Sequence, residues 1–213
     1  MLSNLYKFFI LMLLSIFIIG VNFLPAKVYC NQKIVLFGDS LMSGYGLDEE
    51  FHLSTILEKR LKLKDFNVKV INASVSGDTT SGGLNRLNWL LTRKDIDIVI
   101  LCLGANDMLR GINPIQIRQN LDKILENLTE KKITVLFAGM LAQESFGEKY
   151  KKEFDKIFPE LAKKFKVSFL PFLLDGVALN PELNLKDGKH PNAEGIKLIS
   201  QNLEKKLINL LLN

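Results

Sequence analysis

Residues 33–41 of the chain read KIVLFGDSL, an unbroken apolar run followed at once by a small polar turn. A strand with one face in water would alternate apolar and polar residues, whereas Ile34–Phe37 are apolar throughout. A continuous run of this kind is typical of a strand buried on both faces, as in a parallel sheet covered by helices. The stretch therefore predicts an α/β fold in which Asp39 and Ser40 follow the carboxyl end of a buried strand.

Four further apolar runs have the same character, and they alternate with segments of helical periodicity. The predicted strands are Ile34–Phe37, Val68–Asn72, Ile98–Leu103, Ile133–Ala138 and Val167–Leu170. The predicted helices include one that begins at Asn113-Pro114 and buries Ile117, Leu121, Ile124, Leu125 and Leu128, one over Glu148–Lys166, and a last one over Ile196–Leu210. This alternation predicts a three-layer α/β/α sandwich around a five-stranded parallel sheet.

Composition indicates one ordinary globular domain. The 213 residues are 47% hydrophobic and 24% charged, so intrinsic disorder is not expected. The net charge of +5 admits a nucleic-acid partner, but the lysines are scattered along helices such as Glu148–Lys166 and no recognition module is present. We expect a monomer that binds no nucleic acid and contacts anionic membrane surfaces only weakly.

The first thirty residues differ from the rest. Lys7 precedes the apolar run Phe8–Gly20, which contains no acidic residue, as in a secretory signal. We therefore assign residues 1–30 to a signal peptide and residues 31–213 to the folded domain. This predicts a periplasmic or secreted protein.

Two properties of the leader stay open. Cleavage fits after either Ala26 or Cys30. Together with Val21–Leu24 the apolar run is about long enough to span a bilayer, so an uncleaved anchor is the alternative to cleavage.

Small polar clusters follow three of the strands, and a fourth cluster precedes the last helix. These clusters are Gly38–Leu41, Asn72–Asp78, Gly104–Asp107 and Asp187–Asn192. Each one alone has an ordinary explanation as a turn or a helix cap. In a parallel sheet, however, the carboxyl ends of the strands meet at one edge, where ligands bind. Together the clusters supply a nucleophile, a base with an orienting carboxylate, and polar donors, which is the set that acyl transfer requires.

The two histidines of the chain narrow the choice of base. His52 follows an acidic stretch at a predicted helix start, where an exposed polar residue needs no special role. His190 is therefore the candidate general base. Cys102 lies in a predicted buried strand, so two histidines and one core cysteine offer no metal-ligand spacing. We expect neither a metal nor another cofactor.

Three blocks of the sequence resemble those of the SGNH, or GDSL, hydrolases. They are IVLFGDSL at 34–41, NASVSGDT at 72–79 and DGKHPN at 187–192, in that order. The resemblance covers about residues 33–212. The spacing is most similar to that of the periplasmic acyl-CoA thioesterases, lysophospholipases and arylesterases of Gram-negative bacteria. It implies a flavodoxin-like fold and hydrolysis of acyl esters or thioesters through an acyl-serine, without a cofactor.

The resemblance also implies a role for each matching residue. Ser40 would be the nucleophile and would lend its backbone N–H to the oxyanion hole. Gly77 would lend a second N–H, and Asn106 its side-chain amide. His190 would be the base, with Asp187 holding its imidazole.

One departure and one further inference accompany the resemblance. Ala105 stands where these enzymes often have glycine, which predicts a change in local packing of the loop before Asn106. Loops predicted at Met108–Gly111 and Met140–Gly147 carry apolar residues that either form an acyl-binding channel or merely cover the sheet. The candidate lining residues are Leu109, Ile112, Met140, Leu141 and Phe146.

Two rival functions stay open. The first is a carbohydrate O-deacetylase, which acyl-chain preference would distinguish from a long-chain esterase. The second is a non-catalytic lipid- or glycan-binding module. Silent relatives would be expected to lose the serine or the histidine, and both are present here.

Overall fold

The computed structural model describes residues 31–93 and 95–212. The predicted signal peptide, residues 1–30 with Cys30, lies outside the described residues. Within them, no helix combines the length and the apolar character that crossing a membrane demands.

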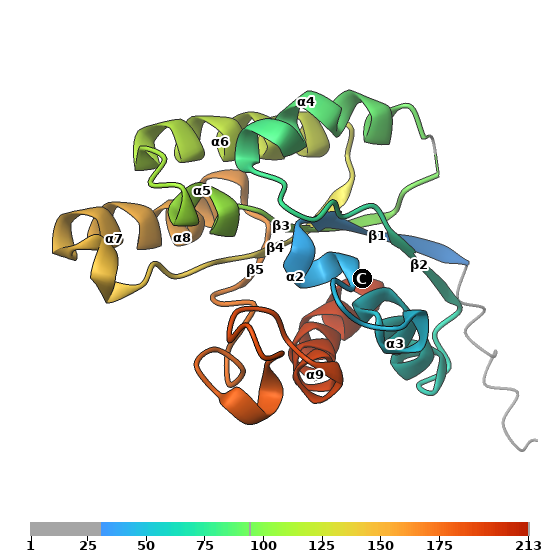
Figure 1. Ribbon diagram of the computed structural model, residues 1–213. Coiled ribbons are helices and arrows are strands. Elements are labelled where there is room, and N and C mark those ends of the chain that lie inside the picture. Colours follow the sequence, from blue (N-terminus) through green and yellow to red (C-terminus); the bar gives the residue numbers. More distant parts are fainter. Residues whose placement is uncertain (1–30, 94, 213) are drawn as a thin grey trace, which may run out of the picture.

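A parallel sheet forms the centre of the molecule (Figure 1). Its strands are β1 (Gln32–Gly38), β2 (Val68–Asn72), β3 (Ile98–Cys102), β4 (Thr134–Ala138) and β5 (Ser168–Leu170). The spatial order is β2-β1-β3-β4-β5, and every neighbouring pair is parallel. The predicted fold class is thus confirmed, with strand ends that differ from the prediction by two residues at most.

Helices cover both faces of the sheet, as Figure 1 shows. Helices α3 (Leu53–Lys62) and α9 (Ala193–Leu211) pack together on one face, and α4 (Thr80–Leu91), α6 (Pro114–Glu130) and α8 (Ile157–Phe165) on the other. Shorter elements connect them: α2 (Ser40–Ser43), α5 (Ala105–Leu109), α7 (Glu148–Asp155) and the 3₁₀ turns η1 (Glu49–Phe51), η2 (Glu144–Phe146) and η3 (Pro181–Leu183). Each crossover between parallel strands carries at least one helix, as this topology requires.

The apolar runs form the core for the reason that their pattern indicates. Every residue of Ile34–Phe37 and of β3 is buried, because helices lie on both sides of these central strands. Helix α6 buries the predicted face and begins where expected, since the Asn113 side chain accepts a hydrogen bond from Ile115 N and Pro114 occupies the first turn. Cys102 is a buried free thiol in β3, and burial raises its pKa well above the usual value.

The predicted continuous helix over Glu148–Lys166 is wrong. The structure divides it into α7 and α8 at Lys156. Pro159 explains the break, because proline lacks the N–H that would bond to the carbonyl of Asp155, and its ring clashes with that carbonyl. The proline was visible in the sequence, and it outweighs the helical periodicity.

A buried polar cluster ties the helices on one face to the carboxyl edge of the sheet. The Asp107 carboxylate accepts hydrogen bonds from Thr80 N at 2.8 Å and from Thr80 Oγ1 at 2.6 Å. Asn120 of α6 donates to the same Thr80 hydroxyl at 3.0 Å. Helices α4, α5 and α6 are therefore joined beside Asn106, the residue that precedes Asp107.

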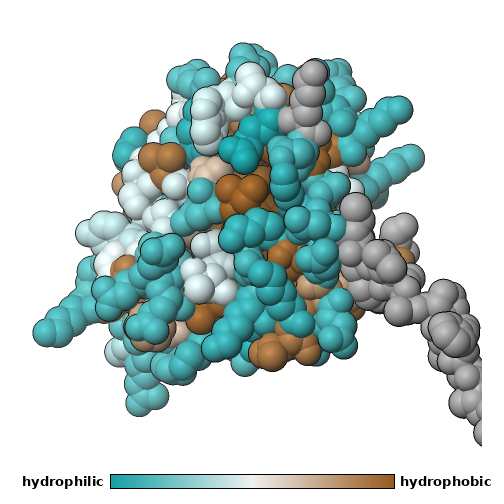
Figure 2. All heavy atoms as spheres, turned by 90° about the vertical axis from the view of Figure 1, so that its right-hand side faces the viewer, coloured by the Kyte–Doolittle hydropathy of each residue, from teal (hydrophilic) through white to brown (hydrophobic). Residues whose placement is uncertain are grey.

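Figure 2 shows one surface of the molecule. On this face hydrophilic residues predominate, and apolar residues form small separate groups between them. Single apolar residues on a surface are normal in a globular protein. The small apolar groups on this face therefore need no special explanation.

Candidate active site

Ser40 lies at the first position of α2, directly after β1. Asp39 caps this helix, because its Oδ1 accepts a hydrogen bond from Leu41 N at 3.0 Å. Leu41 and Met42 are buried and anchor the short helix to the core. The strand and the cap together fix the backbone of Ser40 at the carboxyl edge of the sheet.

The loop before α9 brings Asp187 and His190 to this serine. His190 Nδ1 lies 2.7 Å from Asp187 Oδ2, and His190 Nε2 lies 2.9 Å from Ser40 Oγ. The loop is closed by an antiparallel bridge between Asn184 and Pro191. Serine, imidazole and carboxylate thus form one hydrogen-bonded chain, the arrangement that a serine nucleophile requires.

Asp187 is held ionised by its own loop. Its Oδ1 accepts hydrogen bonds from the backbone N–H groups of His190 and Lys189 at 3.0 and 2.8 Å. The bond from His190 N, then the one from the His190 ring, lowers the pKa of Asp187 to about 2. A carboxylate can only accept hydrogen bonds, so Nδ1 of His190 donates to it and Nε2 is free to accept from the Ser40 hydroxyl.

Two backbone N–H groups predicted to stabilise an oxyanion are available at this edge. Ser40 is the first residue of its helix, so its N–H has no intrahelical acceptor. The Gly77 N–H has no acceptor within the described part of the chain. A Cβ built on Gly77 would meet nothing within 4 Å, so open space faces this residue.

Asn106 is close to the serine's helix cap, but its amide is engaged. Nδ2 donates to Asp78 O at 2.9 Å and to Asp39 Oδ2 at 3.3 Å. An amide nitrogen has two hydrogens, so both already point at protein oxygens. The bond to Asp39 is the longer and therefore the weaker of the two.

The alanine before Asn106 fits the backbone that it occupies. The positive φ of this block, 119°, falls on Gly104, which precedes the first helical residue of α5. Ala105 itself is helical and buried. The methyl group therefore packs in the core and leaves the conformation of the loop to Gly104.

Asp39 is a buried carboxyl, a property that its position after the first strand does not predict. It is 1% exposed. Burial raises its pKa to about 7; the bond from Leu41 N opposes this rise, and the carboxylates of Asp78 and Asp107 add to it. The Asp39 carboxyl caps the helix that begins with Ser40, and it also accepts a hydrogen bond from the Asn106 amide. Its charge is therefore coupled to the candidate site.

Arg86 is a second residue that sequence reasoning missed. From α4 its guanidinium pairs with Asp78 at 2.6 Å and donates to Ala73 O and Gly38 O at 2.6 and 3.1 Å. It thereby holds the loops after β1 and β2 against each other. No feature of the sequence distinguishes this arginine from others on helix surfaces.

The five predicted lining residues lie in different environments. Leu109 and Leu141 are 46% and 41% exposed, and Ile112 and Phe146 are half-buried. Met140 is buried in the core. The loop predicted at Met108–Gly111 is partly helical, because α5 extends through Leu109.

One contact joins two of these residues. The Tyr150 hydroxyl donates to Ile112 O at 2.9 Å, and its ring lies 5.6 Å from that of Phe146. Ile112 and Phe146 therefore belong to one neighbourhood.

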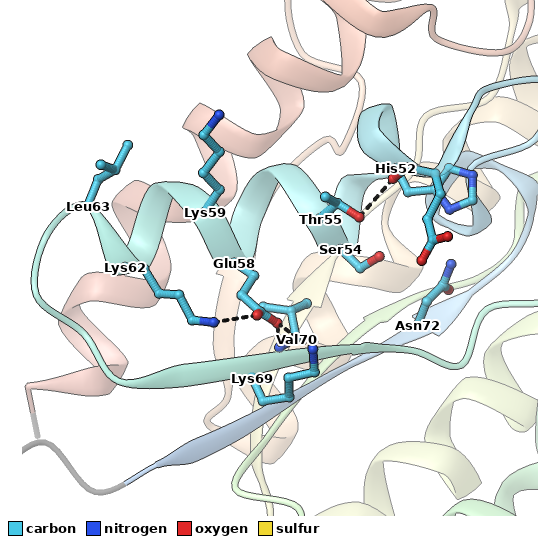
Figure 3. A pocket seen from close by; sticks show the side chains of 11 residues that line it. His52, Ser54, Thr55, Glu58, Lys59, Lys62, Leu63, Lys69, Val70 and Asn72 are labelled. Atoms are coloured by element: carbon cyan, nitrogen blue, oxygen red, sulfur yellow. Dashed lines mark hydrogen bonds and ion pairs between the residues drawn. The ribbon is translucent and has the colours of Figure 1, made fainter.

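An open groove occurs elsewhere, between α3 and the edge strand β2 (Figure 3). Its lining includes Glu58, whose carboxylate pairs with Lys62 and Lys69 and accepts from Val70 N. Ser40 and His190 are not among its lining residues. The Glu58 carboxylate is therefore satisfied by partners within the groove itself.

His52 lines the same groove, and it is less exposed than its place at a predicted helix start suggested. Its ring is half-buried, and Nε2 lies 3.1 Å from Leu47 O. The sequence could not show this contact, because it depends on how the turn before the helix folds back.

Comparisons with known proteins agree on one group. The model of the GDSL-like lipase/acylhydrolase family matches residues 36–198. An arylesterase of Vibrio mimicus is 35% identical over 87% of this chain and 92% of its own length. The thioesterase 1/protease 1/lysophospholipase L1 of Escherichia coli K12 is 34% identical over 86% of this chain and 87% of its own.

Solved structures give the same result. The crystal structure of TesA has a TM-score of 0.80 and 33% identity, and the match covers 84% of this chain and 99% of the TesA chain. AlinE4, an SGNH-hydrolase family esterase, has a TM-score of 0.72 and 41% identity, covering 85% of this chain and 97% of its own.

The buried Asp39 predicts a distinctive dependence of stability on pH. Its folded-state pKa of about 7 lies above the 3.8 that is usual for an aspartate in water, so the folded state binds more protons between these pH values. Its contribution to the free energy of unfolding therefore decreases as pH rises from about 4 to about 7, by up to about 4 kcal/mol, and levels off above. Asp39→Asn should remove this component.

The measurement is urea denaturation of both proteins at several pH values between 4 and 8. The exposed Asp175→Asn serves as a matched control and should follow the parent. Parallel curves for the parent and Asp39→Asn would show that Asp39 is ionised throughout this range.

Proposed function

The chain belongs to the GDSL-like lipase/acylhydrolase family, and from this premise we propose that Ser40, Asp187 and His190 form the catalytic triad of an acyl esterase and thioesterase. The protein is a serine hydrolase that acts on ester bonds. The observation that carries the assignment is the continuous chain of hydrogen bonds, 2.7 and 2.9 Å long, from Asp187 through His190 to Ser40.

Acylation follows from this geometry. A serine hydroxyl is a weak nucleophile until a base takes its proton. His190 Nε2 accepts the proton as Ser40 Oγ bonds to the carbonyl carbon, and Asp187 stabilises the imidazolium through Nδ1. The bond to the leaving oxygen or sulfur then breaks, and His190 returns the proton to that leaving group.

Deacylation repeats these steps with water. His190 removes a proton from a water molecule, whose oxygen bonds to the acyl carbon. The bond to Ser40 Oγ breaks, the serine recovers the proton, and the carboxylic acid leaves. No atom changes its oxidation state, so the cycle balances with water as the only co-substrate.

Charge that develops on the carbonyl oxygen needs donors in both half-reactions. We assign this role to the N–H groups of Ser40 and Gly77 and to the side-chain amide of Asn106. The free Gly77 N–H and the open space before it support the assignment. Asn106 would exchange its long contact with Asp39 for one to the oxyanion, so the bond forms as the charge appears.

For the substrate, we propose an acyl ester or thioester with an apolar chain. Leu109 follows β3 and Leu141 follows β4, both exposed near the carboxyl edge of the sheet, and Ile112 and Phe146 lie farther along the same loops. We assign these residues to the acyl-binding surface, with the buried Met140 beneath it. The relatives named arylesterase and thioesterase/lysophospholipase support aryl esters, acyl-CoA and lysophospholipids as substrates to test.

The nucleophile is tested by labelling. A fluorophosphonate probe should modify the parent protein once, and Ser40→Ala should abolish both the label and hydrolysis of p-nitrophenyl esters. Ser43→Ala is a matched control, because this serine lies in the same short helix and should leave the label intact. Equal labelling of Ser40→Ala and the parent would exclude Ser40.

The same assay decides the substrate class. Initial rates are compared for p-nitrophenyl esters of increasing chain length, for palmitoyl-CoA and for a lysophospholipid. Rates that rise with chain length support the apolar acyl site. Activity confined to acetyl esters would instead identify a deacetylase.

Asn106→Ala tests the oxyanion hole. If the amide acts only in the transition state, kcat should decrease by about 10²- to 10³-fold with KM little changed. A role confined to the loop would lower thermal stability and change KM together with kcat. A stable variant with near-normal kcat would remove Asn106 from the oxyanion hole.

We also propose export of the mature chain, on the strength of Lys7 and the apolar run Phe8–Gly20. Mass spectrometry of protein from a bacterial periplasm should show a first residue between Lys27 and Gln32. Full-length protein found only in the membrane fraction would instead indicate the anchor. Light scattering and vesicle flotation of the mature protein would measure its proposed monomeric state and weak membrane contact.

A further inference from the structure

Tyr45 contacts the candidate base, and the mechanism above gives it no role. Its ring centroid lies 4.3 Å from that of His190, with 35° between the planes. The side chain is 50% exposed, so the hydrophobic core does not account for its position. A large aromatic residue half in water against a reactive imidazole calls for a physical explanation.

The two hydrogen bonds of His190 restrain its ring less strongly in one direction than in the others. Both are made by nitrogens in the plane of the ring, to Asp187 on one side and to Ser40 on the other. Such bonds hold the nitrogens along the hydrogen-bonding directions but oppose a tilt of the ring out of its plane only weakly. An out-of-plane tilt would turn the Nε2 lone pair away from the serine proton. A flat group against the face of the ring restricts this tilt.

The turn that carries Tyr45 is packed tightly on one side. Gly44 has a φ of 90°, and a Cβ there would lie 2.2 Å from Cδ2 of His52. His52 in turn contacts Leu47 O through Nε2 at 3.1 Å. The His52 ring therefore occupies the space where a side chain at position 44 would lie. Glycine leaves this space to the ring, and it also adopts the positive φ without strain.

The other side of the turn meets the loop that carries the base. A Cβ on Gly46 would lie 2.9 Å from Cδ1 of Leu185. Leu185 N donates to His190 O at 2.7 Å, so this leucine belongs to the same loop as the imidazole. His52 and Leu185 thus pack against the turn from opposite sides, and Leu185 is hydrogen-bonded to His190. These contacts fix the position of Tyr45 against His190.

We propose that Tyr45 is a positioning residue for the base: its ring limits the tilt of the His190 imidazole and offers a π face to the imidazolium that forms during the reaction. This rests on the proposed function, since His190 must act as the base. An aromatic face attracts a cation. The Tyr45 ring therefore stabilises the His190 imidazolium and also keeps the neutral imidazole aligned with Ser40. The hydroxyl is not required for either effect.

Three variants test the proposal. Tyr45→Ala should lower kcat by about tenfold and leave KM within about twofold, because misalignment affects the chemical step more than binding. Its rate of fluorophosphonate labelling should decrease in parallel, as labelling also needs the base. Tyr45→Phe keeps the ring and should restore both rates to within about twofold of the parent. Trp89→Ala removes a similarly exposed aromatic residue from α4 and should have no effect.

The outcomes distinguish a failure of the positioning role of Tyr45 from a failure of the proposed function. Equal rates for Tyr45→Ala and the parent would overturn the positioning role, as would an equal loss in Tyr45→Phe, which would assign the effect to the hydroxyl. A raised KM with unchanged kcat would make Tyr45 a substrate contact and also overturn it. A parent that neither labels nor hydrolyses esters would instead remove the proposed function, and this inference with it. Melting temperatures within about 2 °C of the parent ensure that the comparison concerns folded proteins.

Discussion

The hydrogen bond between Ser40 and His190 joins residues 150 positions apart, and it exists because all five strands are parallel. Parallel strands end at the same edge, so whatever follows each strand gathers there. A reversed strand would carry its cluster to the opposite edge. The helices that return the chain between strands also bury both faces of the sheet. One topological constraint therefore accounts for the apolar strands and for the polar edge.

The edge gives different properties to carboxyl groups of the same kind. Asp187 lies in an exposed loop that donates three hydrogen bonds to it, so its pKa is lowered to about 2. Asp39 is buried below the serine with few donors, and its pKa is raised to about 7. The first is suited to hold a permanent charge beside an imidazolium. The second is suited to a structural role in which its charge changes near neutral pH.

Most of the polar groups near the serine also connect secondary-structure elements. Arg86 links the loops after β1 and β2, and Asp107 links α4 and α5. Tyr45 connects the turn after α2 to the loop before α9. The nucleophile is thus surrounded by contacts between segments that are distant in sequence, which is how a site on loops becomes rigid.

The sequence by itself determined the strands, the order of the polar clusters and the triad candidates, because burial on two faces and catalytic chemistry both restrict residue type at particular positions. It also contained Pro159, which divides α7 from α8, although the helical periodicity on its own predicted one continuous helix. Only the tertiary structure decided that Met140 is buried, that His52 supports a turn, that Asp39 is an unusual carboxyl and that Tyr45 meets His190. These properties arise from contacts between distant segments, and no local pattern of residues encodes which side chains will meet across a folded edge.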